Sequence, residues 1–519
     1  MASPRQLRKN LGAEAEEIAE THISWVFLTD KDAYKVKKPV NLGFLDFSTL
    51  ELRKRACEAE LELNRRLAPD VYLGLTPVKR DTNGRIHFNG RGETVDWAVH
   101  MRRLPEAERA DRLVASGELR RAQVERLAEW VADFHGRARD GEEIARFGRA
   151  ELIEANVREN FEQSRPFIRR YLGAGPASEL EALQLSFARW QRSLLAARVA
   201  GHHIRDGHGD LRLQQIYLPA GGPPRILDCI EFNERFRYGD VASDLAFLAM
   251  DFQDQGRPDL AEALLGAYAR ASNDFDLYSV IDFYEAYRAH VRAKVSGMLA
   301  RDRDAPPPLR ERADEDAARL FRLALSIARG ERRLNSPILI AVGGTVGSGK
   351  STVAERISRL LGAPRTDADR TRKHQLGVRP TEFMGGERAK EAYSGERTEL
   401  TYQELFRRAE VVLASRRAII LDASFRLARY RLQARRTARA AGAKFVFVEC
   451  QASLETCRNR LLERESRPSV SDARADLLKG FTASFEPVRE LEPEERVVID
   501  TERPFSEGVT ELVRSLSRS

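Results

Sequence analysis

The chain has 519 residues, 42% of them hydrophobic and 32% charged, and is longer than one hydrophobic core usually serves, so two or three globular domains are expected. Its 86 basic and 79 acidic residues are interleaved, so the net charge of +7 does not favour nucleic-acid binding, and its four cysteines lack a zinc-binding spacing. The opening MASPRQLRKN has no apolar signal segment and no apolar run is long enough to span a membrane, so a cytoplasmic protein is expected, with its oligomeric state left open.

The first hundred residues predict a β-rich lobe. The segment ISWVFLTDKDAYKVKKPV contains two strand patterns separated by a turn at residues 29–32. A helical pattern over residues 49–67 follows and stops before Pro69. Three more strand patterns come next, YLGLTPVKR, RIHFNG and DWAVHMRRL, with Asn83-Gly84 suited to a tight turn. Residues 20–100 are therefore expected to form a small lobe.

Beyond Pro105 the pattern is mostly helical, which predicts a larger lobe over residues 101–300 of the same domain. Short β-like patterns interrupt it at QQIYL and PRILDCIEF. The stretch RDRDAPPPLRERADED combines three consecutive prolines with mixed charge, so residues 301–335 are predicted to form a linker followed by a helix at 309–329.

From residue 336 to the C-terminus, short apolar runs alternate with helical segments. The runs are PILIAVGG, RAIILDA, KFVFVEC and RVVID. This alternation predicts an α/β domain over residues 336–519 with a parallel sheet.

The strongest motif is GGTVGSGKST, which lies between a strand pattern and a helical pattern and has the spacing G-x-x-x-x-G-K-[ST] of a P-loop. In such a loop the glycines let backbone N–H groups face the phosphates, and the helix N-terminus adds positive potential. Lys350 is expected to reach the terminal phosphates and Ser351 to hold Mg²⁺. The predicted ATP site comprises Gly344, Gly347, Gly349, Lys350, Ser351 and Thr352.

Three further residues of this domain have positions suited to catalysis. Asp422 ends the apolar run AIILDA, where a P-loop protein needs a carboxylate near the metal, although an Asp at a strand end is often a helix cap. In RTDADR, Asp367 and Arg370 follow a predicted strand at the substrate-binding edge of the sheet. Asp367 could accept a proton from a substrate hydroxyl while Arg370 orients the substrate; a solvated turn is the alternative.

A possible phosphate-covering lid is formed by CRNRLLERESRPSVSD. Arg460 and Arg464 lie four residues apart on one helical face, with Arg467 beyond them. The chain is rich in arginine, so a chance arrangement stays open as the alternative.

Together these residues resemble the P-loop kinases of the zeta-toxin, gluconate-kinase and polynucleotide-kinase kind. The resemblance covers residues 336–519. It implies an adenylate-kinase-like fold and ATP-dependent phosphotransfer, and it leaves the phosphate acceptor open.

A second set of residues suits a kinase site in the N-terminal half. The loop HGDLRLQQIY contains Asp210, and Asp228 follows 18 residues later in RILDCIEF. A kinase site needs one carboxylate for the substrate proton and another for the metal. In AYKVKK, Lys37 or its same-face neighbour Lys35 could bridge the α- and β-phosphates, held by Glu60 on the following helix.

The order Lys, helix Glu, HGD and Asp resembles the aminoglycoside phosphotransferase-like kinases over residues 20–300. The segments FH at 134–135, GDVASDLAFL and YEAYRAHVRAKV also look like that family. The resemblance implies a bilobal, protein-kinase-like α+β fold, with Asp210 as base, Asp228 as magnesium ligand and Asp244 bracing the catalytic loop.

Two departures from that family concern the nucleotide site. The first strands lack a GxGxxG loop, and Gln215 stands where the metal-binding Asn is expected. A Gln amide oxygen can ligate Mg²⁺ if the loop retreats, but its extra rotor costs about 0.5–1 kcal/mol to order. Slower turnover, altered metal preference and lost chemistry all fit.

The whole chain thus resembles bacterial fusions of an aminoglycoside phosphotransferase-like domain with a P-loop kinase-like domain. The leading hypothesis is an ATP- and Mg²⁺-dependent phosphotransferase acting on a hydroxyl of a small molecule. Two alternatives stay open: a pseudokinase-like N-terminal module that senses a ligand and controls the P-loop domain, and a zeta-toxin-like kinase acting on a metabolite such as a nucleotide-sugar.

Overall fold

The computed structural model describes residues 9–11, 15–21, 23–41, 43, 45–334, 336–384, 386–465, 470–472 and 474–517. The chain divides into two compact units. Unit 1 contains residues 1–258 and 283–328, and unit 2 contains residues 259–282 and 329–519. Each unit combines two separate stretches of the chain. This division does not test the domain limits expected from the sequence, which stay a prediction.

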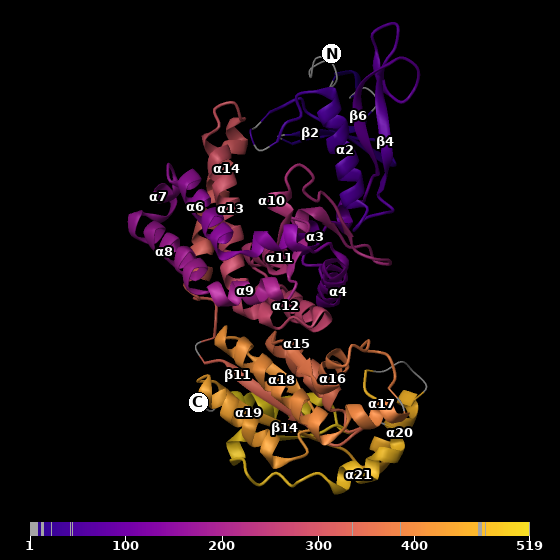
Figure 1. Cartoon of the computed structure of the whole chain (residues 1–519), viewed down its shortest axis with the longest axis vertical. Helices are drawn as coiled ribbons and strands as arrows, with labels where there is room; N and C mark the ends of the chain where they lie inside the picture. Colours follow the sequence, from indigo (N-terminus) through magenta and orange to yellow (C-terminus); the bar gives the residue numbers. More distant parts are fainter. Residues whose placement is uncertain are drawn as a thin grey trace. The chain divides into compact units, whose positions relative to one another are not determined.

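Within its described residues, unit 1 starts with an antiparallel sheet in the order β1-β2-β3-β6-β4-β5. Its strands are β1 (Glu17–Glu20), β2 (Ser24–Leu28), β3 (Asp32–Lys37), β4 (Tyr72–Arg80), β5 (Ile86–Phe88) and β6 (Glu93–Arg102). Helix α2 (Leu50–Asn64) contacts β4 and β6 (Figure 1). The Thr49 hydroxyl caps α2 by accepting a hydrogen bond from Leu52 N. The predicted β-rich lobe and its first hairpin are confirmed.

The rest of unit 1 is mainly helical. Its helices and 3₁₀ turns are η1 (Glu106–Glu108), α3 (Ala110–Ala115), α4 (Arg121–Arg137), α5 (Glu142–Ala145), η2 (Arg146–Gly148), α6 (Ala150–Ser164), α7 (Ile168–Leu172), α8 (Ala174–Trp190), α9 (Arg192–Ala200), η3 (Leu213–Gln215), α10 (Glu234–Arg237), α11 (Val241–Asp254), α13 (Ile281–Arg301) and α14 (Pro307–Ala328). Two short antiparallel pairs frame the loop that carries Asp210. They are β7 (Ile204–Asp206) with β10 (Tyr238–Asp240), and β8 (Ile216–Tyr217) with β9 (Arg225–Ile226).

Helix α14 begins inside the run of prolines. Proline suits the first turn of a helix, where its missing N–H would have no intrahelical partner. The apolar face of α14 contacts α7, α8 and α11, so this helix belongs to unit 1. The helix predicted at 309–329 is therefore present, shifted by two residues at its start and one at its end.

Unit 2 is built on a parallel sheet in the order β12-β13-β11-β14-β15. Its strands are β11 (Ile338–Gly343), β12 (Arg365–Asp367), β13 (Ile419–Asp422), β14 (Lys444–Gln451) and β15 (Arg496–Asp500). Its helices and 3₁₀ turns are α12 (Pro258–Ser272), η4 (Asp276–Ser279), α15 (Lys350–Leu361), α16 (Ala368–Gln375), α17 (Gly386–Ala392), α18 (Gly395–Ala414), α19 (Ala428–Ala440), α20 (Leu454–Glu465), η5 (Ala475–Leu477), α21 (Leu478–Ala483), η6 (Pro493–Glu495) and α22 (Phe505–Ser517). The predicted α/β architecture is confirmed.

Alternate residues of the unit 2 strands supply two apolar faces. Ile340 and Val342 of β11 share a buried cluster with residues of α15 and α22. On the other face, the Phe447 ring contacts Phe425, which in turn contacts Tyr402 of α18. The sheet is therefore covered on both sides (Figure 1), as the continuous apolar strands predict.

The segment 259–282 joins unit 2 through charged contacts. Arg417 binds Glu262 at 3.0 Å and Asp282 at 2.8 Å, and its side chain is 5% exposed. Arg408 Nη2 donates to Asn273 Oδ1 at 2.9 Å. Buried arginines need such partners, since leaving them unpaired would be costly.

No helix among the described residues combines the length and the apolar composition needed to cross a bilayer.

Candidate active sites

The P-loop of unit 2 connects β11 to α15 and leaves space only for glycine. Gly344, Gly347 and Gly349 all have positive φ. A Cβ atom on Gly347 would lie 2.5 Å from Cys457 O, and one on Gly344 would lie 2.6 Å from Cys450 O. The loop can therefore turn its backbone tightly at the start of α15, as phosphate binding requires.

Two hydroxyls of this loop are arranged for a ligand. Thr345 Oγ1 and Ser348 Oγ are shielded from solvent, and neither has a hydrogen-bond partner within the described part of the chain. Buried hydroxyls without partners are unfavourable, and phosphate oxygens would satisfy them. The donor set therefore fits a nucleotide phosphate.

The metal-binding residues predicted for the P-loop lie together. Parallel pairing of β11 with β13 sets Asp422 opposite Val342, two residues before Gly344 of the loop. Ser351 Oγ donates to Asp422 Oδ1 at 3.3 Å. A hydroxyl and a carboxylate in this arrangement suit Mg²⁺ with its shell of waters.

Burial and charge set the state of Asp422. Burial raises the pKa of Asp422 to about 6, against the opposing effect of the Arg365 guanidinium at 3.2 Å. Asp367 adds to the rise, because it lies opposite Asp422 in the β12–β13 pairing. The sequence did not predict a role for Arg365, because nothing in its local pattern indicates a partner 57 residues away.

Asp367 also caps a helix. Its Oδ1 accepts a hydrogen bond from Arg370 N at 2.8 Å at the start of α16, and the Arg370 side chain lies 3.7 Å from Oδ2. This is the capping role common for an Asp before a helix. A catalytic role for Asp367 and a substrate role for Arg370 stay predictions.

A cavity of about 540 Å³ beside the P-loop brings both predicted lid arginines together with Gly347, Gly349 and Thr352. Arg460 donates to Thr501 Oγ1 at 2.9 Å and to Gly347 O at 3.4 Å, so it fastens the P-loop to the segment after β15. Arg464 lines the same cavity, whereas Arg467 lies outside the described residues. The sequence analysis did not single out several other cavity residues, among them Arg356, Arg503 and Phe505.

In unit 1 the kinase-like residues also converge. Lys35 Nζ lies 2.7 Å from Asp228 Oδ1 and 2.8 Å from Glu60 Oε1. Lys37 Nζ lies 2.5 Å from Glu60 Oε2 and also binds Glu231. The Lys37 side chain is fully buried, while that of Lys35 is 12% exposed and contacts the candidate metal ligand. Lys35 is thus the better placed of the two to reach a nucleotide.

Electrostatics favour the charged forms of this cluster. Burial opposes ionisation, yet the nearby carboxylates of Asp228 and Glu60 hold the pKa of Lys35 well above its usual value. Burial would raise the pKa of Asp228, but the positive charge of Lys35 outweighs burial and lowers it. Asp228 also has a left-handed backbone with φ of 60°, a strained conformation often found at functional sites.

The catalytic loop is held from behind by Asp244 of α11. Asp244 Oδ2 accepts from His208 N at 2.6 Å, and Oδ1 accepts from Gly209 N at 2.8 Å. A Cβ on Gly209, whose φ is 86°, would lie 2.7 Å from Phe236 O. The predicted bracing role of Asp244 therefore has a direct geometric basis.

The candidate base Asp210 is bound by an arginine that the sequence did not single out. Arg212 Nε lies 2.8 Å from Asp210 Oδ1, and Arg212 Nη2 lies 2.9 Å from Oδ2. Burial works against the charge of Arg212, but Asp210 and Asp251 raise its pKa. Asp210 is therefore oriented by a two-point charge-assisted contact.

Backbone pairing sets Gln215 next to the candidate metal ligand. Leu227 N donates to Gln215 O at 2.9 Å, and Asp228 is the next residue. The backbone of Gln215 is thus close to that of Asp228, as the kinase-like arrangement predicts. Metal binding by the Gln215 amide stays a prediction.

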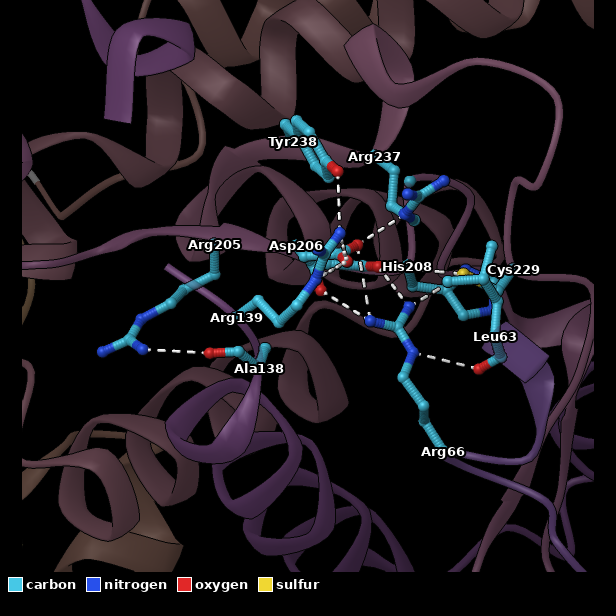
Figure 2. Close-up of polar contacts among 12 residues, drawn as sticks. Leu63, Arg66, Ala138, Arg139, Arg205, Asp206, His208, Cys229, Arg237 and Tyr238 are labelled. Atoms are coloured by element: carbon cyan, nitrogen blue, oxygen red, sulfur yellow. Dashed lines mark hydrogen bonds and ion pairs between the residues drawn. The ribbon is translucent and has the colours of Figure 1, made fainter. Parts of the chain in front are cut away.

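A cluster of arginines supports the start of the catalytic loop, as Figure 2 shows. Three guanidinium groups converge on the buried Asp206, with Arg139 Nη2 at 3.0 Å, Arg66 Nη1 at 3.4 Å and Arg237 closer still. Arg66, just after α2, also donates to Gly207 O at 3.0 Å and to Cys229 Sγ at 3.2 Å. The cluster links the β-rich lobe to the catalytic loop, and no local sequence pattern predicts it.

Known proteins match both halves of the chain. The phosphotransferase enzyme family matches residues 44–284, and the family described as AAA domain matches residues 339–488. An uncharacterized protein of Mycobacterium tuberculosis (strain ATCC 25618 / H37Rv) is 34% identical over 472 residues, which cover 90% of this chain and 89% of that protein. An uncharacterized protein of Mycobacterium bovis (strain ATCC BAA-935 / AF2122/97) matches with the same identity and coverage.

Solved structures align with parts of the chain. A gluconokinase from Sinorhizobium meliloti 1021 is 22% identical, with a TM-score of 0.27, and the match covers 36% of this chain and 94% of that one. A choline/ethanolamine kinase family protein from Mesorhizobium loti is 14% identical, with a TM-score of 0.35, and the match covers 60% of this chain and 92% of that one.

The fold and the two sites define a kinase in which a phosphotransferase domain precedes a nucleotide-binding P-loop domain. The two-domain resemblance seen in the sequence is thereby confirmed. The chain belongs to the protein family that includes these mycobacterial proteins.

Proposed function

We propose that this kinase transfers a phosphoryl group from ATP to a hydroxyl group of a small molecule and requires Mg²⁺. The main support is the P-loop, where the buried hydroxyls of Thr345 and Ser348 have no partner among the described residues and Ser351 contacts Asp422. The kinase-like site of unit 1 is proposed as a second site for phosphotransfer. A cytoplasmic location stays a prediction from the sequence.

At the P-loop, the glycine-rich backbone and Lys350 would hold the phosphates, and Ser351 with Asp422 would hold the metal. Bound Mg²⁺ would neutralise charge on the transferring phosphoryl group. Arg460 and Arg464 line the adjoining cavity and would stabilise the nucleotide by charge. Asp367, at the same sheet edge, is the proposed acceptor of the substrate hydroxyl proton.

At the site of unit 1, Asp210 would accept the hydroxyl proton, held in orientation by Arg212. Lys35 would contact the phosphates while Glu60 keeps it in place, and Asp228 with Gln215 would hold the metal. Lys35 and Asp228 contact each other directly in this structure, so a nucleotide would have to insert between or beside them.

Separate substitutions in the full chain test these assignments. Lys350→Ala is expected to lower turnover at the P-loop by about 100-fold or more, and Asp210→Ala is expected to lower turnover of unit 1 by a similar factor. Each variant loses a group used in the transition state. Lys479→Ala, at an exposed position in α21, is the control for Lys350→Ala. If neither Lys350→Ala nor Asp210→Ala changes ATP turnover, the proposed function is wrong.

A second candidate function for unit 1 is nucleotide or ligand sensing without turnover. The Asp210–Arg212 ion pair and Gln215 favour it. The ion pair occupies the candidate base, and Gln215 replaces the Asn that a kinase uses to bind the metal. Phosphotransfer by the Lys350→Ala chain would refute it. A chain that binds nucleotide in unit 1 and shows turnover only at the P-loop would support it.

A further inference from the structure

Unit 1 contains a cavity of about 590 Å³ that adjoins the candidate base Asp210. Helices α6, α10, α11 and α13 line it together with the catalytic loop. Its apolar walls include Phe247, Phe283 and Tyr284. The size suits a small organic molecule, and the position suits an acceptor whose hydroxyl faces Asp210.

The lining of this cavity has an excess of positive charge. Seven basic side chains and four carboxylates line it. Each carboxylate already has partners: Glu159 binds Arg235, Asp210 binds Arg212, Asp240 binds Arg198, and Asp244 accepts hydrogen bonds from the backbone N–H groups of His208 and Gly209. A cationic acceptor would therefore meet no free carboxylate and would be repelled by the remaining charge.

Among the described residues, two of the basic side chains have only neutral hydrogen-bond partners. Arg288 Nε donates to Ser243 Oγ at 3.1 Å and to Ser243 O at 3.2 Å, and its guanidinium lies 4.7 Å from the centre of the Phe247 ring. Lys294 Nζ donates to the amide oxygens of Asn160 and Gln163, both at 2.7 Å. Neither cation has an ion-pair partner among the residues that the structure describes.

The environment of Lys294 reflects this missing partner. Burial lowers the pKa of Lys294 to about 8, helped by the nearby Arg235 and against the opposing effect of Glu159. A partly buried cation without a carboxylate is costly, and a bound anion would offset that cost. Glu159, the carboxylate that acts on Lys294, is already paired with Arg235.

We propose that the hydroxyl acceptor of unit 1 is an anion, a hydroxy compound carrying a carboxylate or phosphate group whose charge is met by Arg288 and Lys294. Its apolar part would lie against the aromatic wall. This inference rests on the proposed phosphotransfer at Asp210. Arg288 is linked to the catalytic loop through α11, because its partner Ser243 precedes Asp244, which binds the loop.

A labelling experiment tests the anion site without requiring turnover. The full chain is treated with pyridoxal 5′-phosphate or with pyridoxal, reduced with borohydride, and modification of Lys294 is measured by peptide mass spectrometry relative to the exposed Lys479. The phosphate form is expected to modify Lys294 at least about tenfold faster, the gain from one charge-assisted contact. Equal normalised rates, or no modification of Lys294, would overturn the proposal.

Variants on α13 sharpen this test. Arg288→Gln is expected to reduce the preference for the phosphate form several-fold, because one of the two cations is lost. Arg301→Gln lies on the same helix but outside the cavity and should leave the preference unchanged. An equal effect of both variants would indicate a general charge effect and would contradict the site.

Acceptor selection separates failure of this inference from failure of the proposed function. The Lys350→Ala chain is assayed with ATP and matched acceptors: hydroxy acids, sugar phosphates, the corresponding uncharged esters and sugars, and amino alcohols. Turnover of the anionic acceptors, with KM raised at least about tenfold in Arg288→Gln and kcat less affected, would support both ideas. Turnover of only neutral or cationic acceptors would overturn the anionic class alone. Phosphate-selective labelling without turnover of any acceptor would retain the anion site and remove the proposed phosphotransfer by unit 1.

Discussion

Arg212 binds both carboxylate oxygens of Asp210, with its Nε 2.8 Å from Oδ1 and its Nη2 2.9 Å from Oδ2. The two residues are separated by one position in a loop, so the contact is local and well oriented. The contact fixes the orientation of the Asp210 carboxylate. Arg212 also competes with a substrate hydroxyl for hydrogen bonds to that carboxylate. The pair therefore bears on both the catalytic and the sensing functions considered for unit 1.

A double-mutant cycle measures the strength of this pair. Asp210→Asn, Arg212→Gln and the double variant are compared by urea unfolding, followed by tryptophan fluorescence, because all four tryptophans lie in unit 1. We expect a coupling free energy of about 1–3 kcal/mol, since the pair is largely shielded from water. The exposed Asp133–Arg137 pair on α4 is the control, with an expected coupling below about 0.5 kcal/mol. Equal coupling of the two pairs would contradict the expectation.

Lys35 and Lys37 are expected to have different roles. Lys37→Met should lower the free energy of unfolding by about 3–5 kcal/mol, because Glu60 and Glu231 would lose a fully buried cation. Lys35→Met should instead mainly lower turnover of unit 1, measured in the Lys350→Ala chain, because Lys35 contacts Asp228. The opposite ranking, with Lys37 controlling turnover, would show that the nucleotide-binding lysine has been assigned wrongly.

Gln215→Asn is expected to raise phosphotransfer by unit 1 in the Lys350→Ala chain. The shorter amide has one rotor fewer to order, worth about 0.5–1 kcal/mol, which corresponds to a rate gain of roughly two- to fivefold. Gln215→Met is the control, because it keeps the approximate length but removes the ligand oxygen, and it should abolish the activity. An unchanged Mg²⁺ dependence in both variants would show that residue 215 does not bind the metal.

The raised pKa of Asp422 predicts a pH-dependent stability difference. Its folded-state pKa of about 6 exceeds the ordinary value of 3.8, so its ionisation favours unfolding, and its contribution to stability is lost as pH rises from about 4 to about 6. Asp422→Asn cannot ionise, so its stability relative to the native sequence should rise over this window by up to about 3 kcal/mol. Urea unfolding followed by circular dichroism measures the difference.

Asp476→Asn, at an exposed position in η5, provides the matched control and should show little change over the same pH range. A stability difference for Asp422→Asn that is constant with pH, or that falls as pH rises, would contradict the buried, proton-binding state of this carboxyl group.

Much of the fold and of both candidate sites follows from local patterns. The P-loop needs glycines at fixed spacing between a strand and a helix, and the sequence has both the spacing and the context. The HGD loop and Asp228 are likewise set by short segments with β-like patterns on either side. Period-two alternation in the first strands placed Lys35 and Lys37 on one face but could not separate them. Their different burial depends on Glu60 and Asp228, which come from other elements.

The sequence by itself determined the two kinase-like domains, the P-loop and the order of the kinase residues, because these depend on spacing within short segments. Only the tertiary structure decided that Arg66, Arg139 and Arg237 converge on Asp206, that Arg365 faces Asp422, and that residues 259–282 pack with unit 2. In so arginine-rich a chain, each guanidinium has many possible carboxylate partners. Long-range packing selects among them, because burial makes an unpaired charge costly wherever the chain brings it out of water.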